Sequence, residues 1–116
     1  MQDYKKLRVW SKGHQFTLTI YKVAARFPRE ETFALTSQLK RASISVPANI
    51  AEGCGKNSTK DFANFLNISL GAANEAEYYL ILAKDLNYMS VSEFEELNIL
   101  INEIKGMLIN LIQTVR

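Results

Sequence analysis

The sequence predicts an all-α protein, an antiparallel up-down-up-down four-helix bundle formed by one domain over residues 1–116. Apolar residues recur with helical spacing along most of the chain, and no segment alternates polar and apolar residues as a strand would. Only two prolines and five glycines interrupt that pattern. With 116 residues, 47% of them hydrophobic, the chain is the right size for a single core.

The first helix is expected over residues 9–27. Its apolar positions follow an alternating spacing of four and three residues, which buries one face of a helix. Pro28 should end this helix, because the residue before a proline avoids helical dihedral angles. The expected seam consists of Val9, Gly13, Phe16, Ile20, Val23 and Phe27.

The second helix is expected over residues 32–52, although Pro47 lies inside it. An interior proline removes one hydrogen bond and costs about 3 kcal/mol, so the segment either kinks or restarts near Ser45. We favour a kinked continuous helix, because the apolar period passes Pro47 without a slip. Ser43 or Ser45 would then satisfy the freed backbone groups. The inner face is formed by Leu35, Leu39, Ala42, Val46 and Ile50.

The turn after this helix contains two glycines. Gly53 and Gly55 should stop the helix with a left-handed cap, which favours a residue without a β-carbon. Ser58, with Asp61 three residues later, resembles a capping box and should begin the third helix.

The third helix should continue to about residue 86. Its seam is bulky at both ends and small in the middle, where Gly71 lies beside it, so another helix should approach closely. The expected seam is Phe62, Phe65, Ser69, Ala72, Ala76, Tyr79, Ala83 and Leu86.

The fourth helix should be capped by Ser90 with Glu93, or by Ser92 with Glu95. A regular heptad follows, formed by Phe94, Leu97, Ile101, Ile104, Leu108, Leu111 and Val115. Further apolar residues lie around the helix from this seam, and one core cannot face every side. We therefore expect self-association through this surplus, with Tyr78 and Ile81 sharing the contact. The surplus comprises Ile99, Leu100, Met107, Ile109 and Ile112.

Charge is distributed unevenly along the chain. Residues 1–57 contain ten Lys/Arg and four acidic residues, net +6, whereas residues 58–116 contain four and eight, net −4. This asymmetry suits a basic face that binds nucleic acid, and it equally suits two halves that attract each other. The sequence shows no apolar stretch of membrane-spanning length and no signal peptide, and Cys54 is the single cysteine. We expect a cytoplasmic protein without a membrane partner.

Chemistry-bearing residues are sparse. His14 and Cys54 are the only residues of their types, and no metal-ligand spacing occurs, so we expect no metal, no cofactor and no enzymatic activity. His14 lies next to the inner face of the first helix and should be partly buried. Lys56 and the free amides before the third helix offer a place for a phosphate, but a simple turn is the favoured interpretation.

A polar stripe follows the second helix. At about 100° per residue, its members fall within roughly 80° of arc. Arg41 and Glu52 lie about 16 Å apart along the helix, so each needs a partner on another helix, another subunit or a ligand. The stripe is therefore either a seam that sets helix register or subunit contact, or a recognition surface. It consists of Gln38, Arg41, Ser45, Asn49 and Glu52.

Several segments resemble the four-helix-bundle family encoded within 23S rRNA intervening sequences, which has a ribosomal-protein-like label. They are residues 4–10 (YKKLRVW), 35–42 (LTSQLKRA), 46–53 (VPANIAEG) and 58–65, with its Asp61-Phe62 pair. Glu75, or Glu77, matches a glutamate of the family's third helix, and we favour Glu75. The resemblance implies a homopentameric ring without known enzymatic activity. It also implies similarity to the accessory variability protein of diversity-generating retroelements, which is thought to bind nucleic acid and a reverse transcriptase.

Two functions follow as hypotheses. The first is a non-enzymatic oligomeric accessory protein that binds structured RNA such as rRNA. The second is a protein-interaction scaffold with no nucleic-acid role. Under the RNA-binding hypothesis, a structural or interface polar seam is formed by Gln38, Arg41, Asn49, Glu52 and Glu75. The candidate phosphate contacts are Lys5, Lys6, Arg8, Lys12, Lys22, Arg26, Lys40 and Arg41.

Overall fold

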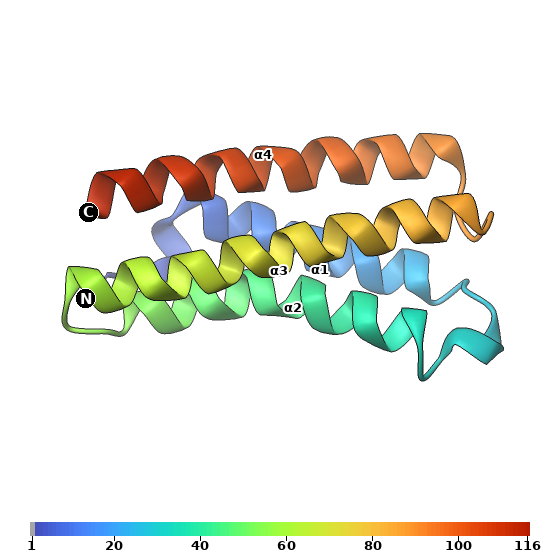
Figure 1. The fold of residues 1–116 in the computed structure, drawn as a ribbon, viewed down its shortest axis with the longest axis horizontal. Coiled ribbons are helices and arrows are strands. Elements are labelled where there is room, and N and C mark those ends of the chain that lie inside the picture. Colours follow the sequence, from blue (N-terminus) through green and yellow to red (C-terminus); the bar gives the residue numbers. More distant parts are fainter. Residues whose placement is uncertain (1) are drawn as a thin grey trace.

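The computed structural model describes residues 2–116. Successive helices run antiparallel, each packs against its neighbours in the chain, and the last closes on the first (Figure 1). The predicted up-down-up-down four-helix bundle is therefore confirmed. The elements are η1 (Tyr4–Lys6), α1 (Arg8–Ala24), η2 (Arg29–Glu31), α2 (Leu35–Cys54), α3 (Thr59–Asp85) and α4 (Val91–Val115), where η marks a single 3-10 turn.

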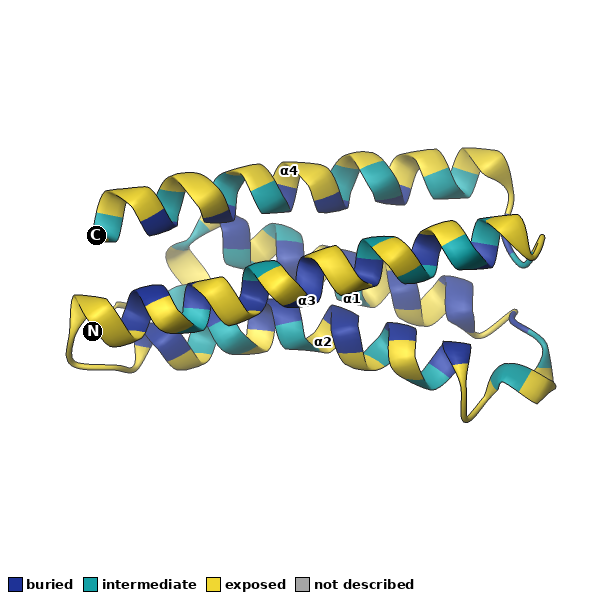
Figure 2. Cartoon of the chain, viewed as in Figure 1, coloured by how far each residue is buried: buried dark blue, intermediate teal, exposed yellow. Residues whose placement is uncertain are grey.

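All four helices contribute to one core, and Figure 2 shows buried residues along their inner sides. Burying each large apolar side chain contributes about 1.5–3 kcal/mol relative to leaving it exposed. The largest fully buried apolar side chains are Phe16, Ile20, Leu39, Ile50, Leu66, Leu80, Ile101, Ile104 and Leu108.

The buried line of α3 differs from the predicted seam. Leu66 and Leu80 are fully buried, whereas Phe65 and Tyr79 are half-buried and Leu86 is exposed. Two neighbouring stripes of α3 are both apolar, so periodicity alone does not distinguish them. The core-facing side of α3 keeps most of the predicted seam and adds four residues beside it. The predicted residues that are buried are Phe62, Ser69, Ala72, Ala76 and Ala83, and the added ones are Ala63, Leu66, Ala73 and Leu80.

The apolar surplus of α4 is divided by the fold. Ile112 belongs to the core with 6% of its surface exposed, which corrects its assignment to the surplus. Ile99 and Ile109 remain exposed at 68% and 44%. On α3, Tyr78 and Ile81 are exposed as well. An outward apolar surface therefore exists on α3 and α4, and self-association stays a prediction.

Two predicted helix limits shift by three residues. The first helix ends at Ala24, and a turn follows in which the Phe27 amide donates to the Ala24 carbonyl at 3.0 Å. The second helix begins at Leu35, because η2 and a turn occupy the preceding residues.

The α2 helix continues through Pro47, which confirms the continuous helix in preference to a break. Proline has no N–H for the carbonyl four residues earlier, that of Ser43. The partner of this carbonyl comes from α1, since Thr17 Oγ1 donates to Ser43 O at 2.8 Å. The expectation that Ser43 or Ser45 would satisfy the freed groups is wrong at this carbonyl. Ser69 of α3 also donates to α2, to the Val46 carbonyl at 2.8 Å.

Gly53 is required for close packing and not for a cap. The helix passes through Gly53 to Cys54, and the cap residue Gly55 has φ −84°, so the predicted left-handed glycine cap is wrong. A β-carbon on Gly53 would lie 2.9 Å from Cβ of Phe65, and only glycine allows α2 and α3 to approach so closely here. Gly71 was expected to help such an approach, but a β-carbon at that position would meet no other atom within 4 Å.

The predicted N-terminal caps are confirmed. Ser58 Oγ accepts from the Asp61 amide at 3.1 Å, and Ser90 forms a full capping box with Glu93. The left-handed residue at a helix end is Asn87, with φ 64°, just after α3.

Candidate nucleic-acid interface

The eight cationic residues predicted to contact phosphates lie in two regions at opposite ends of α1. Lys12 and Lys22 are separated by ten residues, or about 15 Å along the helix. Lys40 joins α2 to the second region, with Nζ 4.8 Å from the centroid of the Tyr21 ring. The first region contains Lys5, Lys6, Arg8 and Lys12, and the second contains Lys22, Arg26, Lys40 and Arg41.

Carboxylates of α4 neutralise part of each region. Lys12 Nζ lies 2.8 Å from Glu103 Oε1, and Arg26 forms an ion pair with Glu93. The hydrogen bond from the Ser90 amide is the main cause that holds the pKa of Glu93 below its ordinary value, and the hydrogen bond from Arg26 is the second. Within residues 2–116, the cations of the two regions that form no ion pair are Lys6, Arg8, Lys22, Lys40 and Arg41.

A hollow with a volume of about 440 Å³ lies beside the first region. Trp10 and His14 stack next to it, with ring centroids 5.2 Å apart and an interplanar angle of 9°. Tyr4 meets the Trp10 ring edge-on, with centroids 5.1 Å apart. His14 is exposed, so its expected partial burial is wrong. The hollow is lined by Lys6, Arg8, Trp10, Ser11, Lys12, His14 and Gln15.

The polar stripe of α2 lies on the outside of the bundle. Gln38, Arg41 and Glu52 are exposed, and neither charged side chain, Arg41 or Glu52, forms an ion pair within the described part of the chain. Asn49 Nδ2 donates to the carbonyl and the hydroxyl of Ser45, on its own helix, at 2.7 and 2.8 Å. The three exposed side chains are thus available to a second subunit or a ligand.

The two glutamates of α3 have different surroundings. Glu75 is exposed and accepts a 2.9 Å hydrogen bond from the Tyr79 hydroxyl, which raises the pKa of Tyr79. Glu77 joins α3 to α4, because Lys105 Nζ lies 2.8 Å from its Oε1 and Asn102 donates to Oε2. The hydrogen bond from Lys105 lowers the pKa of Glu77.

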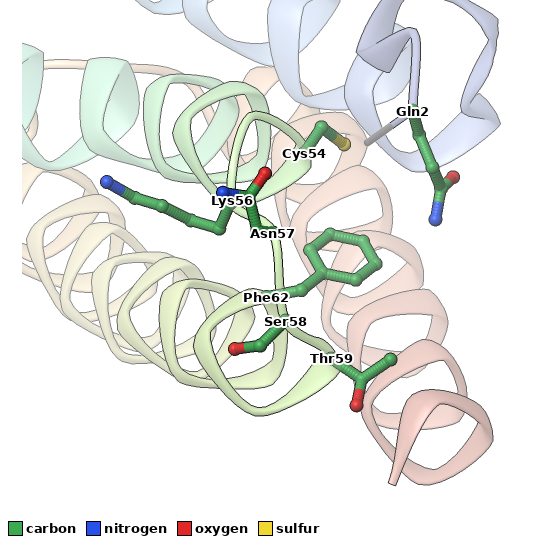
Figure 3. Close-up of a pocket in the computed structure, with 8 residues that line it drawn as sticks. Gln2, Cys54, Lys56, Asn57, Ser58, Thr59 and Phe62 are labelled. Atoms are coloured by element: carbon green, nitrogen blue, oxygen red, sulfur yellow. The ribbon is translucent and has the colours of Figure 1, made fainter.

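The turn between α2 and α3 encloses a small pocket (Figure 3). Cys54 is 2% exposed, and burial raises the pKa of its thiol, so a thiolate nucleophile is disfavoured. Lys56 extends away from Phe62 and Thr59, and its Nζ lies 5.1 Å from the Phe65 ring centroid. The turn packs two helices together and does not direct a cation into the pocket.

Neither a metal centre nor a spanning helix is found in the described region. Across residues 2–116, no three His, Cys, Asp or Glu side chains are grouped closely enough to bind a metal ion. No described helix is both long and apolar enough to cross a membrane. Fold and surface together define a small all-helical bundle with two separate basic regions.

The chain belongs to the family described as 23S rRNA-intervening sequence protein, whose profile matches residues 5–110. A solved structure with the same fold is that of a protein of unknown function from the S23 ribosomal protein family of Bacteroides thetaiotaomicron. It is 34% identical, with a TM-score of 0.84, and the match covers 90% of this chain and 97% of that one. Among curated proteins, none matches this chain.

Proposed function

We propose that this protein is a non-enzymatic, self-associating accessory protein of the cytoplasm that binds structured RNA through its basic regions. The observation that carries the proposal is the set of cations on the α1–α2 side that have no carboxylate partner among residues 2–116. The family description supports RNA as the polyanion, because it names an intervening sequence of 23S rRNA.

Charge placement supports the same function. The basic half of the sequence forms α1 and α2, which are adjacent, and the acidic half forms α3 and α4. The uneven charge of the sequence is therefore an uneven charge of two sides of the bundle. A polyanion gains binding free energy on the basic side by releasing its counterions.

The test is a salt titration of RNA binding, followed by the fluorescence anisotropy of a labelled rRNA hairpin. Affinity should fall steeply as the salt concentration rises, and Lys22→Gln with Arg41→Gln should reduce the slope of log K against log salt by about two. Lys60→Gln with Lys84→Gln is the matched control, since it removes two charges from α3 and should leave the slope unchanged. Affinity independent of salt would refute the proposal.

Self-association is proposed from the exposed apolar residues of α3 and α4. The family resemblance leads us to expect a homopentamer, so light scattering should give about 66 kDa, five times the 13.2 kDa of one chain. Ile99→Asn should dissociate the assembly, whereas Leu18→Asn, which removes an exposed residue of α1, should not. A wild-type chain that remains monomeric at high concentration would contradict the proposal and remove the gain from repeated weak contacts.

A protein-interaction scaffold is the second candidate, favoured by one observation. Phe33, between η2 and α2, is 95% exposed, which is unusual for so large an aromatic side chain. A purified partner that stays bound after nuclease treatment, and is released by Phe33→Ser, would favour the scaffold.

A further inference from the structure

The Trp10–His14 pair is an unusual feature of the basic surface, because its outer ring does not belong to the core. Tyr4 and Trp10 pack against the core, but His14 is exposed and lies nearly parallel to the Trp10 indole. The stack therefore presents a flat imidazole at the surface without burying it.

Helix geometry places cations on the flank of α1 opposite this stack, about 160° around the helix axis. At about 100° per residue, Trp10 and His14 form one stripe of α1, and Arg8 with Lys12 forms another. The small side chain of Ser11 lies between the two stripes. The hollow is thus lined by the Trp10 and His14 rings, by cations and by the small Ser11 between them.

A nucleotide has the matching chemistry, since it joins an aromatic base to an anionic phosphate through the ribose. Bases stack on aromatic side chains in single-stranded nucleic acid, where the base faces are free, while Lys and Arg bind the backbone. A double-stranded segment would offer only its phosphates. The volume of about 440 Å³ lies within the roughly 300–1,000 Å³ of small-molecule sites.

We propose that this hollow stacks one unpaired base of single-stranded RNA against Trp10 and His14, while Lys6 and Arg8 bind the adjoining phosphates. The inference rests on the proposed RNA binding and adds a preference for unpaired nucleotides. Lys12 contributes less, because it already pairs with Glu103.

Trp10 is the single tryptophan of the chain, so its fluorescence reports on this site. The probe is a short oligoadenylate, and the control is an abasic oligonucleotide of equal length and charge. Oligoadenylate should quench the Trp10 emission and bind at least about fivefold more tightly than the abasic strand. His14→Ala should remove most of that preference, and His14→Phe should restore it. Far-UV circular dichroism checks that both variants fold.

Anisotropy of the labelled strands separates the two levels of the argument. Equal binding of both strands, with no change in Trp10 emission, would overturn base stacking and leave phosphate binding intact. An unchanged affinity of His14→Ala for oligoadenylate would overturn it too. Failure of both strands and of the rRNA hairpin to bind would instead refute the proposed function itself.

Discussion

The contact between Thr17 and the Ser43 carbonyl allows a sharp test of how this bundle accommodates a proline. Pro47 has no N–H to donate to the Ser43 carbonyl, and Ser43 is fully buried. Thr17 Oγ1 supplies the donor from the neighbouring helix, at 2.8 Å. Thr17→Val keeps the shape of the side chain and removes its only proton donor.

The free-energy cost of Thr17→Val follows from the loss of the hydrogen-bond donor to the Ser43 carbonyl. A buried acceptor left without a donor costs about 1–3 kcal/mol. The second contact of Thr17, to the Gly13 carbonyl at 3.0 Å, adds little, because that carbonyl remains within the hydrogen-bonded helix. In a Pro47→Ala background, the N–H of residue 47 can bond to Ser43, and Thr17→Val should then cost less than about 0.5 kcal/mol.

The measurement is a double-mutant cycle by urea unfolding of the four proteins at one concentration, since assembly also affects apparent stability. The coupling free energy should be about 1–2 kcal/mol, and Thr17→Val alone should lower Tm by roughly 4–8 °C. Pro47→Ala also changes helix propensity and packing, but the cycle subtracts these effects. Equal costs of Thr17→Val in both backgrounds would show that Thr17 does not replace the missing N–H.

Two further predictions concern stability. Gly53→Ala should destabilise the folded protein by about 1–2 kcal/mol, because the new β-carbon would lie 2.9 Å from Cβ of Phe65. Gly106→Ala should stabilise it by up to about 1 kcal/mol, because the new β-carbon would meet open space. Equal effects of the two in thermal unfolding would contradict close helix approach at Gly53. The hydrogen bond from Lys105 lowers the pKa of Glu77 in the folded state. The ionised Glu77 carboxylate therefore stabilises the fold above the pKa that Glu77 has in the unfolded chain. This stabilisation is lost as the pH falls through the pKa that Glu77 has in the folded protein. The stability advantage of wild type over Glu77→Gln should therefore shrink between about pH 6 and about pH 3, and an advantage constant over that range would refute the role of this pair.

Helical periodicity and capping residues were sufficient to predict the bundle, because both are local properties of the sequence. Ser58 caps the N-terminus of α3 and Ser90 caps that of α4, as predicted. The choice between neighbouring apolar stripes on α3 was not local. Leu66 and Leu80 are buried because of where α2 and α4 lie, which a single helix does not encode. The role of Gly53 likewise depends on the opposite helix.

The site was less predictable than the fold, for the same physical reason. The cationic residues could be identified from the sequence, but their partners could not. Glu103 lies 91 residues after Lys12 in the chain and is its ion-pair partner across α1 and α4. The spacing of four residues between Trp10 and His14 was a usable signal for stacking, because residues so spaced share one helix face.

Closure of the bundle therefore helps to determine where RNA can bind. When α4 packs on α1, its carboxylates neutralise Lys12 and Arg26, and an exposed ion pair contributes little to stability. The larger effect of these pairs is to reduce the positive potential on the side of α1 that faces α4. On the side that faces α2, Lys40 lies over the Tyr21 ring and has no carboxylate partner among residues 2–116. Glu93→Gln should accordingly strengthen RNA binding at low salt by releasing Arg26, and an affinity unchanged in the anisotropy assay would show that the α4 side is not part of the interface.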